Sequence, residues 1–346
     1  MTCHLDPMDG RAAGSSTCND LESDCDGLVP RTCVNGAWKA GLPCTAGCRS
    51  GACTLPPSCD KAPLCGLDQA SCCQTLWVPG GTFTLRGTST SPTVRTSASR
   101  TVSPVALDRF EVTVERFRAF VASYSKETLP ADGAGAHPHV PGSGWNSVWN
   151  DDPELLPPSR DQLQYELTKR GSYNNDTPSD EPIRNVNWYV AFAFCVWDEG
   201  RLPTEAEWAF AASGGDEQRI YPWSSSDRDT SIDESRACYW TMDWPRTSPE
   251  VVGSHPMGRG KYGHDDLAGN VREWLLDYYR DELSECTAGS DDSGGNPDCV
   301  ELTPSTQRAL RGGSFQSESD GLLNTVRISC ESRRLSDLNG FRCARD

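Results

Sequence analysis

The stretch Gly263-His264-Asp265-Asp266-Leu267-Ala268-Gly269-Asn270-Val271-Arg272-Glu273-Trp274 says more about the fold than any other part of this 346-residue chain. Its oxygen donors lie on a tight, glycine-containing loop, which suits a hard cation such as calcium. Short blocks of this kind are weak evidence singly, so their order along the chain carries the information. The accompanying blocks are GRLPTEAEW at 200–208, RGGSF at 311–315 and NGFRCAR at 339–345.

Composition excludes several classes of function. Lys and Arg total 32 against 49 Asp and Glu, and the net charge of −17 argues against nucleic acid, whose phosphates need clustered cations. The same charge disfavours anionic membrane surfaces. No apolar run reaches the roughly 18–20 residues of a membrane span, so no transmembrane segment is expected. The 31 Gly, 24 Pro and 11 Trp indicate a loop-rich globular protein.

The 17 cysteines predict an extracytoplasmic, disulfide-bonded protein, because most of their spacings differ from paired metal-binding knuckles. We therefore expect a secreted, periplasmic or cell-surface protein. No signal peptide is visible, which predicts that Met1 begins a trimmed chain. The odd count leaves one cysteine spare, and Cys3 has either lost its partner or is a lipid attachment site.

Eleven of the cysteines precede residue 74, which marks a change in organisation. We predict a disulfide module at residues 1–58, a cysteine-containing linker at 59–76 and the main domain at 77–346. The module has little apolar material, so crosslinks must offset its chain entropy. Zinc held by Cys44 and Cys48 is the alternative for this module.

Apolar spacing predicts the first elements of the main domain. They are strands at 77–87 and 107–112 and helices at 114–121 and 188–199, the latter stopped by Gly200. Thr204 and Glu207 form a capping box that starts a third helix. Little regular structure is expected after residue 223.

Catalytic signatures of other enzyme classes are missing from the sequence. It contains no Gly-x-Ser-x-Gly elbow, no His-Glu-x-x-His pair and no phosphate-binding glycine loop. Two histidines, His137 and His139, lie in the predicted loop 132–160. We expect both to face solvent, with metal binding as the alternative.

Six ordered blocks resemble the formylglycine-generating enzyme (sulfatase-modifying factor) family over about residues 77–345. The resemblance implies an α+β, loop-rich fold related to the C-type lectin fold. The blocks are VPGGTF at 78–83, FEVT at 110–113, VNW at 186–188, RLPTEAEW at 201–208, GNVREW at 269–274 and GFRC at 340–343.

The resemblance implies one calcium site in the loop quoted first. Its ligands are expected to be Asp266, the carbonyls of Gly269 and Val271, and Glu273. A second calcium site of the family is expected to be lost, because Cys238 stands where the family has an asparagine.

The resemblance also implies a disulfide between Cys195 and Cys343, which ties the chain end to the core. Such a crosslink closes a long loop, where the chain-entropy model predicts the largest stabilisation. A separate disulfide between Cys286 and Cys299 is the simplest interpretation of the acidic insert 284–303.

Cys330 matches one member of another family pair, whose partner position is Ala212 in this chain. Once the other cysteines are assigned, Cys238 is the remaining candidate partner for Cys330. We therefore predict a disulfide between Cys238 and Cys330.

The oxidase of this family uses two cysteines shortly after its Gly-Gly-Ser turn to bind copper(I). Ser317 and Leu322 occupy those positions here. No cysteine lies between Phe315 and Cys330, so no shift of the alignment restores the pair. Copper(I) is soft and needs thiolates, so copper is not expected and no residue is assigned a catalytic role.

These observations favour a non-catalytic binding member of the family, a pseudoenzyme of bacterial type, whose groove takes a protein, peptide or glycan ligand. Ser314, Arg272 and His264 are the expected groove residues. The alternative is an oxidoreductase that acts on a protein cysteine or a small molecule with altered metal ligands, drawn from His255, His264 and Asp265. Loop tryptophans offer binding platforms or pack in the core: Trp145, Trp149, Trp223, Trp240 and Trp244.

Overall fold

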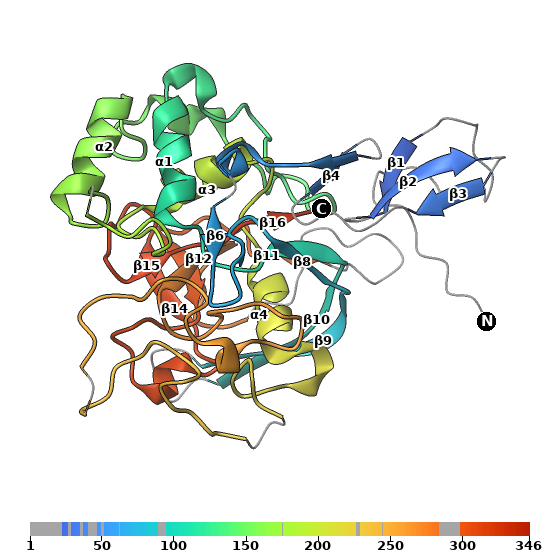
Figure 1. Ribbon diagram of the computed structural model, residues 1–346, viewed down its shortest axis with the longest axis vertical. Coiled ribbons are helices and arrows are strands. Elements are labelled where there is room, and N and C mark those ends of the chain that lie inside the picture. Colours follow the sequence, from blue (N-terminus) through green and yellow to red (C-terminus); the bar gives the residue numbers. More distant parts are fainter. Residues whose placement is uncertain are drawn as a thin grey trace.

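The computed structural model describes residues 23–26, 29–34, 37–40, 47–49, 52–61, 63–88, 95–174, 176–225, 229–243, 245–283 and 298–346. Helices and strands are mixed along the chain, which confirms the expected α+β class, and much of the main domain is loop (Figure 1). No helix in these described ranges is long and apolar enough to span a membrane.

The described residues before β8 form short strands and one 3-10 turn, and β1–β3 lie to one side of the main domain (Figure 1). Strands β1–β3 form one antiparallel sheet, β4 pairs with β5 and β6 pairs with β7. These elements are β1 Ser23–Asp26, β2 Val29–Val34, β3 Ala37–Ala40, β4 Gly47–Arg49, β5 Ala52–Thr54, η1 Pro57–Cys59, β6 Leu64–Cys65 and β7 Ala70–Ser71.

The first strand predicted for the main domain is two strands in the structure. Gly80 separates them, because its φ of 70° turns the chain and an added Cβ would lie 2.4 Å from the Val102 carbonyl. The predicted second strand ends early, at Asp108. The elements are β8 Thr75–Val78, β9 Gly81–Thr88, β10 Arg95–Val102 and β11 Val105–Asp108.

Both predicted apolar helices and the capped third helix are present. Thr204 Oγ1 accepts from Glu207 N and the Glu207 carboxylate accepts from Thr204 N, which is the expected capping box. The helix α2 lies beyond the predicted loop and was missed. The helices are α1 Val114–Ser123, α2 Arg160–Lys169, α3 Trp188–Trp197 and α4 Glu205–Ser213, with short turns η2 Lys126–Thr128, η3 Ser147–Asp151 and η4 Gly215–Glu217.

The end of α3 shows why glycine is needed after it. Glu199, not Gly200, takes the left-handed conformation, with φ of 62°. Gly200 instead allows close approach, because an added Cβ would lie 2.6 Å from the Ala344 carbonyl. The C-terminal strand β16 (Ala344–Arg345) therefore passes directly over this turn.

The region predicted to lack regular structure holds a four-stranded sheet of order β14-β13-β12-β15. The block GNVREW at 269–274 leads into β12, which pairs with β13 on one side and β15 on the other. Within this sheet only the β12–β15 pair is parallel. The elements are η5 Pro256–Gly258, β12 Arg272–Tyr278, β13 Gln307–Arg311, η6 Ser319–Leu322, β14 Ile328–Glu331 and β15 Asn339–Gly340.

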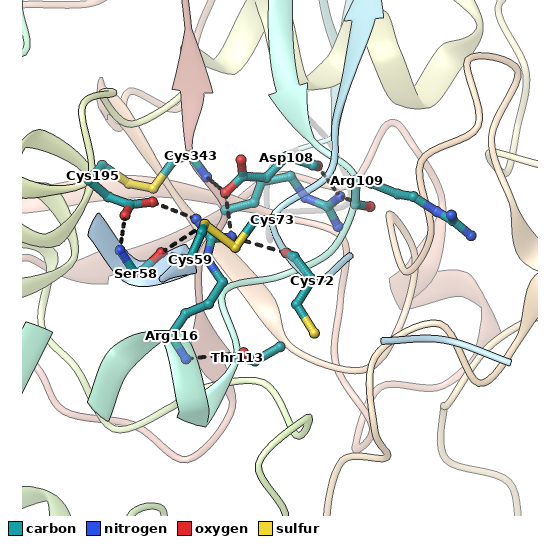
Figure 2. Close-up of polar contacts among 12 residues, drawn as sticks. Ser58, Cys59, Cys72, Cys73, Asp108, Arg109, Thr113, Arg116, Cys195 and Cys343 are labelled. Carbon is teal, nitrogen blue, oxygen red and sulfur yellow. Dashed lines mark hydrogen bonds and ion pairs between the residues drawn. A yellow bond between two sulfur atoms is a disulfide. The ribbon is translucent and has the colours of Figure 1, made fainter. Parts of the chain in front are cut away.

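Residues 57–76 pack directly on the main domain. Arg116 on α1 is fully buried and donates to Ser58 Oγ (3.0 Å), Asp108 (2.9 Å) and Asp198 (2.6 Å). Figure 2 shows this guanidinium beneath the Cys59–Cys73 disulfide, with Cys72 beside it. The segment predicted as a linker is thus anchored by a buried charge network; the boundaries at residues 58 and 76 remain predictions.

The disulfide between Cys195 and Cys343 is present, as the resemblance implied, and links α3 to the C-terminal segment. A further disulfide, between Cys65 and Cys72, lies within the anchored segment. Cys299 is disulfide-bonded, but Cys286 lies outside the described residues, as does Cys44 of the alternative zinc site.

The predicted disulfide between Cys238 and Cys330 is wrong, because both thiols are free. They belong to different parts of the domain. The Cys238 carbonyl accepts from Asn270 N in the loop 263–274. Cys330 lies on β14, where its thiol contacts Asn339 on β15. The pairing was predicted by assigning the other cysteines first. That procedure failed because the sequence does not show which of the remaining cysteines lie close enough to form a disulfide.

Candidate functional site

The loop 263–274 is held in a conformation that few sequences permit. Asp266, Gly269 and Asn270 all have positive φ, at 57°, 89° and 55°. An added Cβ on Gly269 would lie 2.4 Å from the Cys238 carbonyl, so only glycine fits there. Asn270 fixes the turn, because its amide donates to Glu111 Oε2 at 2.6 Å.

Three buried carboxylates meet at this loop. Arg342 donates to both oxygens of Glu273, at 2.7 and 2.8 Å, and Trp208 Nε1 donates to Oε2 at 2.8 Å. Gly253 N donates to Asp266 Oδ2 at 2.6 Å. Burial, together with the charge of Asp265, raises the pKa of Asp266 to about 6. Burial, with the nearby carboxylates, raises the pKa of Glu111 well above its usual range.

This arrangement concentrates negative charge, but the three carboxylates are not among the described groups of side chains whose ligand atoms all lie within 4.8 Å of one another. Glu111, Asp266 and Glu273 bring three carboxylates into the interior, and Arg342 supplies one compensating charge. Among the described contacts, Asp266 Oδ1 has no donor and Glu273 Oε1 accepts only from Arg342, so both retain lone pairs. Glu111 is an acidic partner that the sequence did not single out, because it comes from the distant segment after β11.

The first of the two predicted thiol positions, Ser317, lies in a tight turn after β13, and the second, Leu322, ends η6. Ser314 N donates to Ser317 Oγ at 3.0 Å, and the two hydroxyls are 3.4 Å apart. Trp240 N donates to the Ser317 carbonyl at 2.9 Å, so a long loop covers this turn. Ser317 is half-buried, and its hydroxyl is a structural hydrogen-bond acceptor here.

Leu322 has become part of a hydrophobic cluster. It is 1% exposed and belongs to the buried group that contains Tyr221, Tyr239 and Ala268. Its methyl group would lie 3.1 Å from a Cβ added to Gly313. The second thiol position therefore holds a packed aliphatic side chain.

Two of the three expected groove residues are fully buried. Ser314 lies in the turn at 0% exposure. His264 is also fully buried, and burial lowers its pKa to about 3. Arg272 lies at the start of β12, is half-buried, and has its pKa lowered by burial. The groove itself stays a prediction.

The alternative catalytic set is also not assembled. Asp265 is ion-paired with Arg109 at 2.7 Å and with Arg259 at 3.0 Å, so it is committed to structure. His264, within the loop 263–274, is fully buried and does not reach solvent. His255 pairs with Glu250 instead. These contacts give no support to an active centre at this point.

The histidines of the segment 132–160 are not both solvent-facing. His137 is 3% exposed, and its Nε2 lies 3.3 Å from Glu207 Oε1. His139 is exposed, but its Nδ1 lies 2.6 Å from Asp298 Oδ2. The expectation for His137 is therefore wrong, because α4 and the segment after residue 297 come to this loop in three dimensions.

The tryptophans divide into core and surface. Trp145 is buried among the aromatics around α3, and Trp149 packs on Trp188. Trp223 and Trp240 are half-buried; Trp223 stacks on Tyr221 with ring centroids 4.8 Å apart. Trp244 lies outside the described residues.

Two sizeable cavities lie away from the Ser317 turn. One of about 380 Å³ lies between α2 and the start of α3, lined by Leu163, Leu167 and Val190 among others. Another of about 460 Å³ lies between η1 and α1, beside Lys61 and Trp197. Neither is lined by the residues that the sequence assigned to the site.

Comparison with known proteins places these features in a family. Residues 62–346 match the sulfatase-modifying factor enzyme 1-like domain. The chain is 31% identical over 302 residues to a Mus musculus protein named inactive C-alpha-formylglycine-generating enzyme 2, covering 77% of this chain and 84% of that protein. It is 29% identical over 299 residues to the formylglycine-generating enzyme of Thermomonospora curvata, covering 78% and 92%.

A solved structure agrees on the fold. PvdO from Pseudomonas aeruginosa aligns with a TM-score of 0.56 and 17% identity, covering 85% of this chain and 98% of that one. At this identity the likeness concerns the fold alone. With the family match over residues 62–346 and the Mus musculus relative, the conclusion is that this chain belongs to the formylglycine-generating enzyme (sulfatase-modifying factor) family.

Proposed function

We propose that this chain is a non-catalytic, extracytoplasmic member of the family that binds a protein, peptide or glycan ligand without copper chemistry. The observation that carries the proposal is the Ser317 turn. One thiol position holds a hydroxyl that accepts from Ser314, and the other holds Leu322, packed in a hydrophobic cluster. Neither side chain supplies the soft sulfur that copper(I) requires.

The free cysteines do not replace the missing pair. Cys238 is buried, and burial followed by the charge of Glu250 raises the pKa of its thiol to about 12. A thiol with a raised pKa is a poor nucleophile and a poor source of thiolate. Cys330 lies on β14, on the far side of β13 from β12. The name of the Mus musculus relative, an inactive formylglycine-generating enzyme, supports the same conclusion.

For the binding surface we propose the segment around Trp240, which is half-buried and bonded to the Ser317 turn. An aromatic ring beside a turn offers a platform for a peptide or a sugar. Calcium belongs to this proposal as a structural ion held by Asp266, Glu273 and the carbonyls of Gly269 and Val271, with Glu111 close by. Its role there is to offset the buried negative charge and so stiffen the loop.

A peptide oxidation assay tests the proposal. The purified protein is loaded with copper(I) in air and given a cysteine-containing sulfatase-type peptide, and mass spectrometry follows the conversion of thiol to aldehyde. The wild type should be inert. The double variant Ser317→Cys, Leu322→Cys is run in parallel, and activity confined to it shows that only the chemistry was lost. Turnover by the wild type contradicts the proposal.

If both forms are inert, intrinsic fluorescence measures binding of the same peptide. The Trp240→Ala variant should lose at least about 1 kcal/mol of binding free energy if its ring is the platform. Trp149→Ala provides the control, because that ring packs on Trp188 in the core.

A further inference from the structure

A cluster of three potential metal ligands lies beside the loop 263–274, on side chains that the proposed function does not use. Cys238 Sγ, a carboxylate oxygen of Glu250 and a ring nitrogen of His255 all lie within 4.8 Å of one another. Cys238 and His255 are buried, at 1% and 6% exposure. Glu250 is half-buried, so the cluster is open to solvent on one side.

The backbone holds these residues in place before any ion binds. Asn270 N donates to the Cys238 carbonyl at 2.8 Å. The side-chain oxygen of Asn270 accepts from Glu250 N at 3.0 Å. A single residue of the loop therefore positions two of the three ligands, and His255 follows five residues after Glu250, at the start of η5.

The hydrogen bonding of His255 leaves one nitrogen directed at the cluster. Nδ1 lies 2.8 Å from the Glu234 carbonyl, which can only accept, so Nδ1 carries a proton. In the neutral ring Nε2 then presents a lone pair, and it lies 2.8 Å from Glu250 Oε2. Two acceptors at this distance repel each other unless a proton or a metal ion lies between them. Donation of the second ring N–H to a carbonyl is the usual orientation of a metal-bound histidine.

Cys238 gives an independent reason. It is one of two free cysteines in the described part of a disulfide-rich chain. Its thiol lies in the interior beside the Glu250 carboxylate. A divalent metal suits this pair, because it binds a thiolate and neutralises the carboxylate charge at once.

We propose that Cys238, Glu250 and His255 bind one divalent transition-metal ion, with zinc as the best fit. Sulfur, imidazole nitrogen and one carboxylate oxygen are zinc ligands, whereas calcium takes oxygen donors. The solvent-facing side supplies room for water as the fourth ligand. The ion fixes the segment 238–255 against the loop 263–274, and it also positions Trp240, which lies two residues after Cys238. The metal site does not depend on the proposed ligand-binding function.

Metal titration of the tag-free full chain tests this proposal. Protein is treated with a chelator under non-reducing conditions and then titrated with zinc, and separately with cobalt(II). Cobalt reports on sulfur directly, because only a thiolate ligand gives a near-ultraviolet charge-transfer band. The wild type should bind zinc at one equivalent with this cobalt band.

Variants assign the site. Cys238→Ser and His255→Gln should lower zinc affinity by more than about 100-fold, since loss of an outer-sphere partner alone costs about 10- to 100-fold. Cys330→Ser is the matched control, because it removes the other free thiol of the described residues and should leave both zinc affinity and the cobalt band unchanged. A cobalt spectrum without a sulfur band overturns the proposal and identifies an ordinary imidazolium–carboxylate pair. A sulfur band that persists in Cys238→Ser also overturns it, because another thiol then binds the metal.

A second measurement needs no variant that could misfold. The wild type is alkylated with and without zinc, and mass spectrometry measures labelling of Cys238 and Cys330, the two free thiols among the described residues. Zinc should slow labelling of Cys238 by at least about tenfold, since a metal-bound thiolate is withdrawn from reaction, and should leave Cys330 unaffected. Equal labelling of Cys238 in both conditions contradicts the proposal.

Discussion

The backbone N–H of Ser314 donates to the hydroxyl oxygen of Ser317 across 3.0 Å, in the turn where the resemblance predicts the first thiol of the family oxidase. The Ser317 N–H in return donates to the Ser314 carbonyl at 2.8 Å. This reciprocal pair closes the turn by itself. Ser317, which stands where the resemblance predicts a thiol, therefore has a structural role in this turn through its hydroxyl and its N–H.

Leu322 should be a stability residue. Leu322→Ala is expected to cost about 2–4 kcal/mol of unfolding free energy, because it leaves a cavity in a packed cluster. Leu323→Ala, one residue later and half-buried, should cost about 1 kcal/mol or less. Guanidinium unfolding followed by tryptophan fluorescence measures both. Equal small losses would show that Leu322 is not part of the core.

Arg116 should be needed for folding. It lies between Asp108 and Asp198, at 2.9 and 2.6 Å, and Arg345 is a second buried cation on the same two carboxylates. Arg116→Met therefore leaves two buried carboxylates with one cation. The expected cost is about 3–5 kcal/mol. Arg118→Met is the control, because Arg118 is partly exposed and forms an i,i+3 pair with Glu115 whose loss should cost less than about 1 kcal/mol. Similar thermal midpoints for the two variants would contradict this role.

The disulfide between Cys195 and Cys343 should contribute more than any local crosslink. It joins residues 148 apart in sequence, and the double variant Cys195→Ala, Cys343→Ala should lose about 2–5 kcal/mol of unfolding free energy. Cys330→Ala removes a free thiol of the same chain and serves as the control. Chemical denaturation under non-reducing conditions gives the comparison, and a loss no greater than that of the control counts against the prediction.

Asp277 should make stability fall as pH rises from about 4 to about 7. Burial, followed by the charge of Glu205, raises its pKa from 3.8 to about 7. The folded state then binds more protons than the unfolded state in this window, so the stabilisation is complete below 3.8 and is lost as pH passes about 7. The slope is at most about 1.4 kcal/mol per pH unit.

Asp277→Asn removes this titration and should flatten the pH dependence. It also lowers stability overall, because Asp277 accepts from both Glu205 N and Glu301 N and an amide has only one oxygen. Asp320→Asn, an exposed substitution, should leave the slope unchanged. Urea unfolding across this pH range distinguishes the two variants, and parallel curves for wild type and Asp277→Asn refute the prediction.

Calcium should stabilise the chelator-treated protein in a concentration-dependent way. A ligand that binds only the folded state at 100 times its dissociation constant adds about 2.7 kcal/mol. Asp266→Ala should abolish the effect, whereas Asp266→Asn keeps one oxygen ligand and should only weaken it. Magnesium is the control ion, because it prefers a smaller octahedral site. Thermal unfolding is the readout, and a shift that persists in Asp266→Ala places the ion elsewhere.

Local sequence predicted the elements whose causes are local. The capping box of Thr204 and Glu207 and the apolar spacing of α1 and α3 act within one or two turns of chain, so the helices appear where expected. The lack of cysteine between Phe315 and Cys330 is likewise a property of the sequence alone, and our proposal of a member without copper chemistry rests on it.

Tertiary structure alone decided the rest, because it depends on contacts between distant segments. The sheet around β12 pairs strands separated by long loops, so periodicity within one segment gave no sign of it. His137 is buried only because Glu207 and Asp298 come to it from other parts of the chain. Cys238 lost its predicted partner and gained Glu250 and His255 by the same means. Sequence determined which chemical groups this protein has; only folding determined which of them meet.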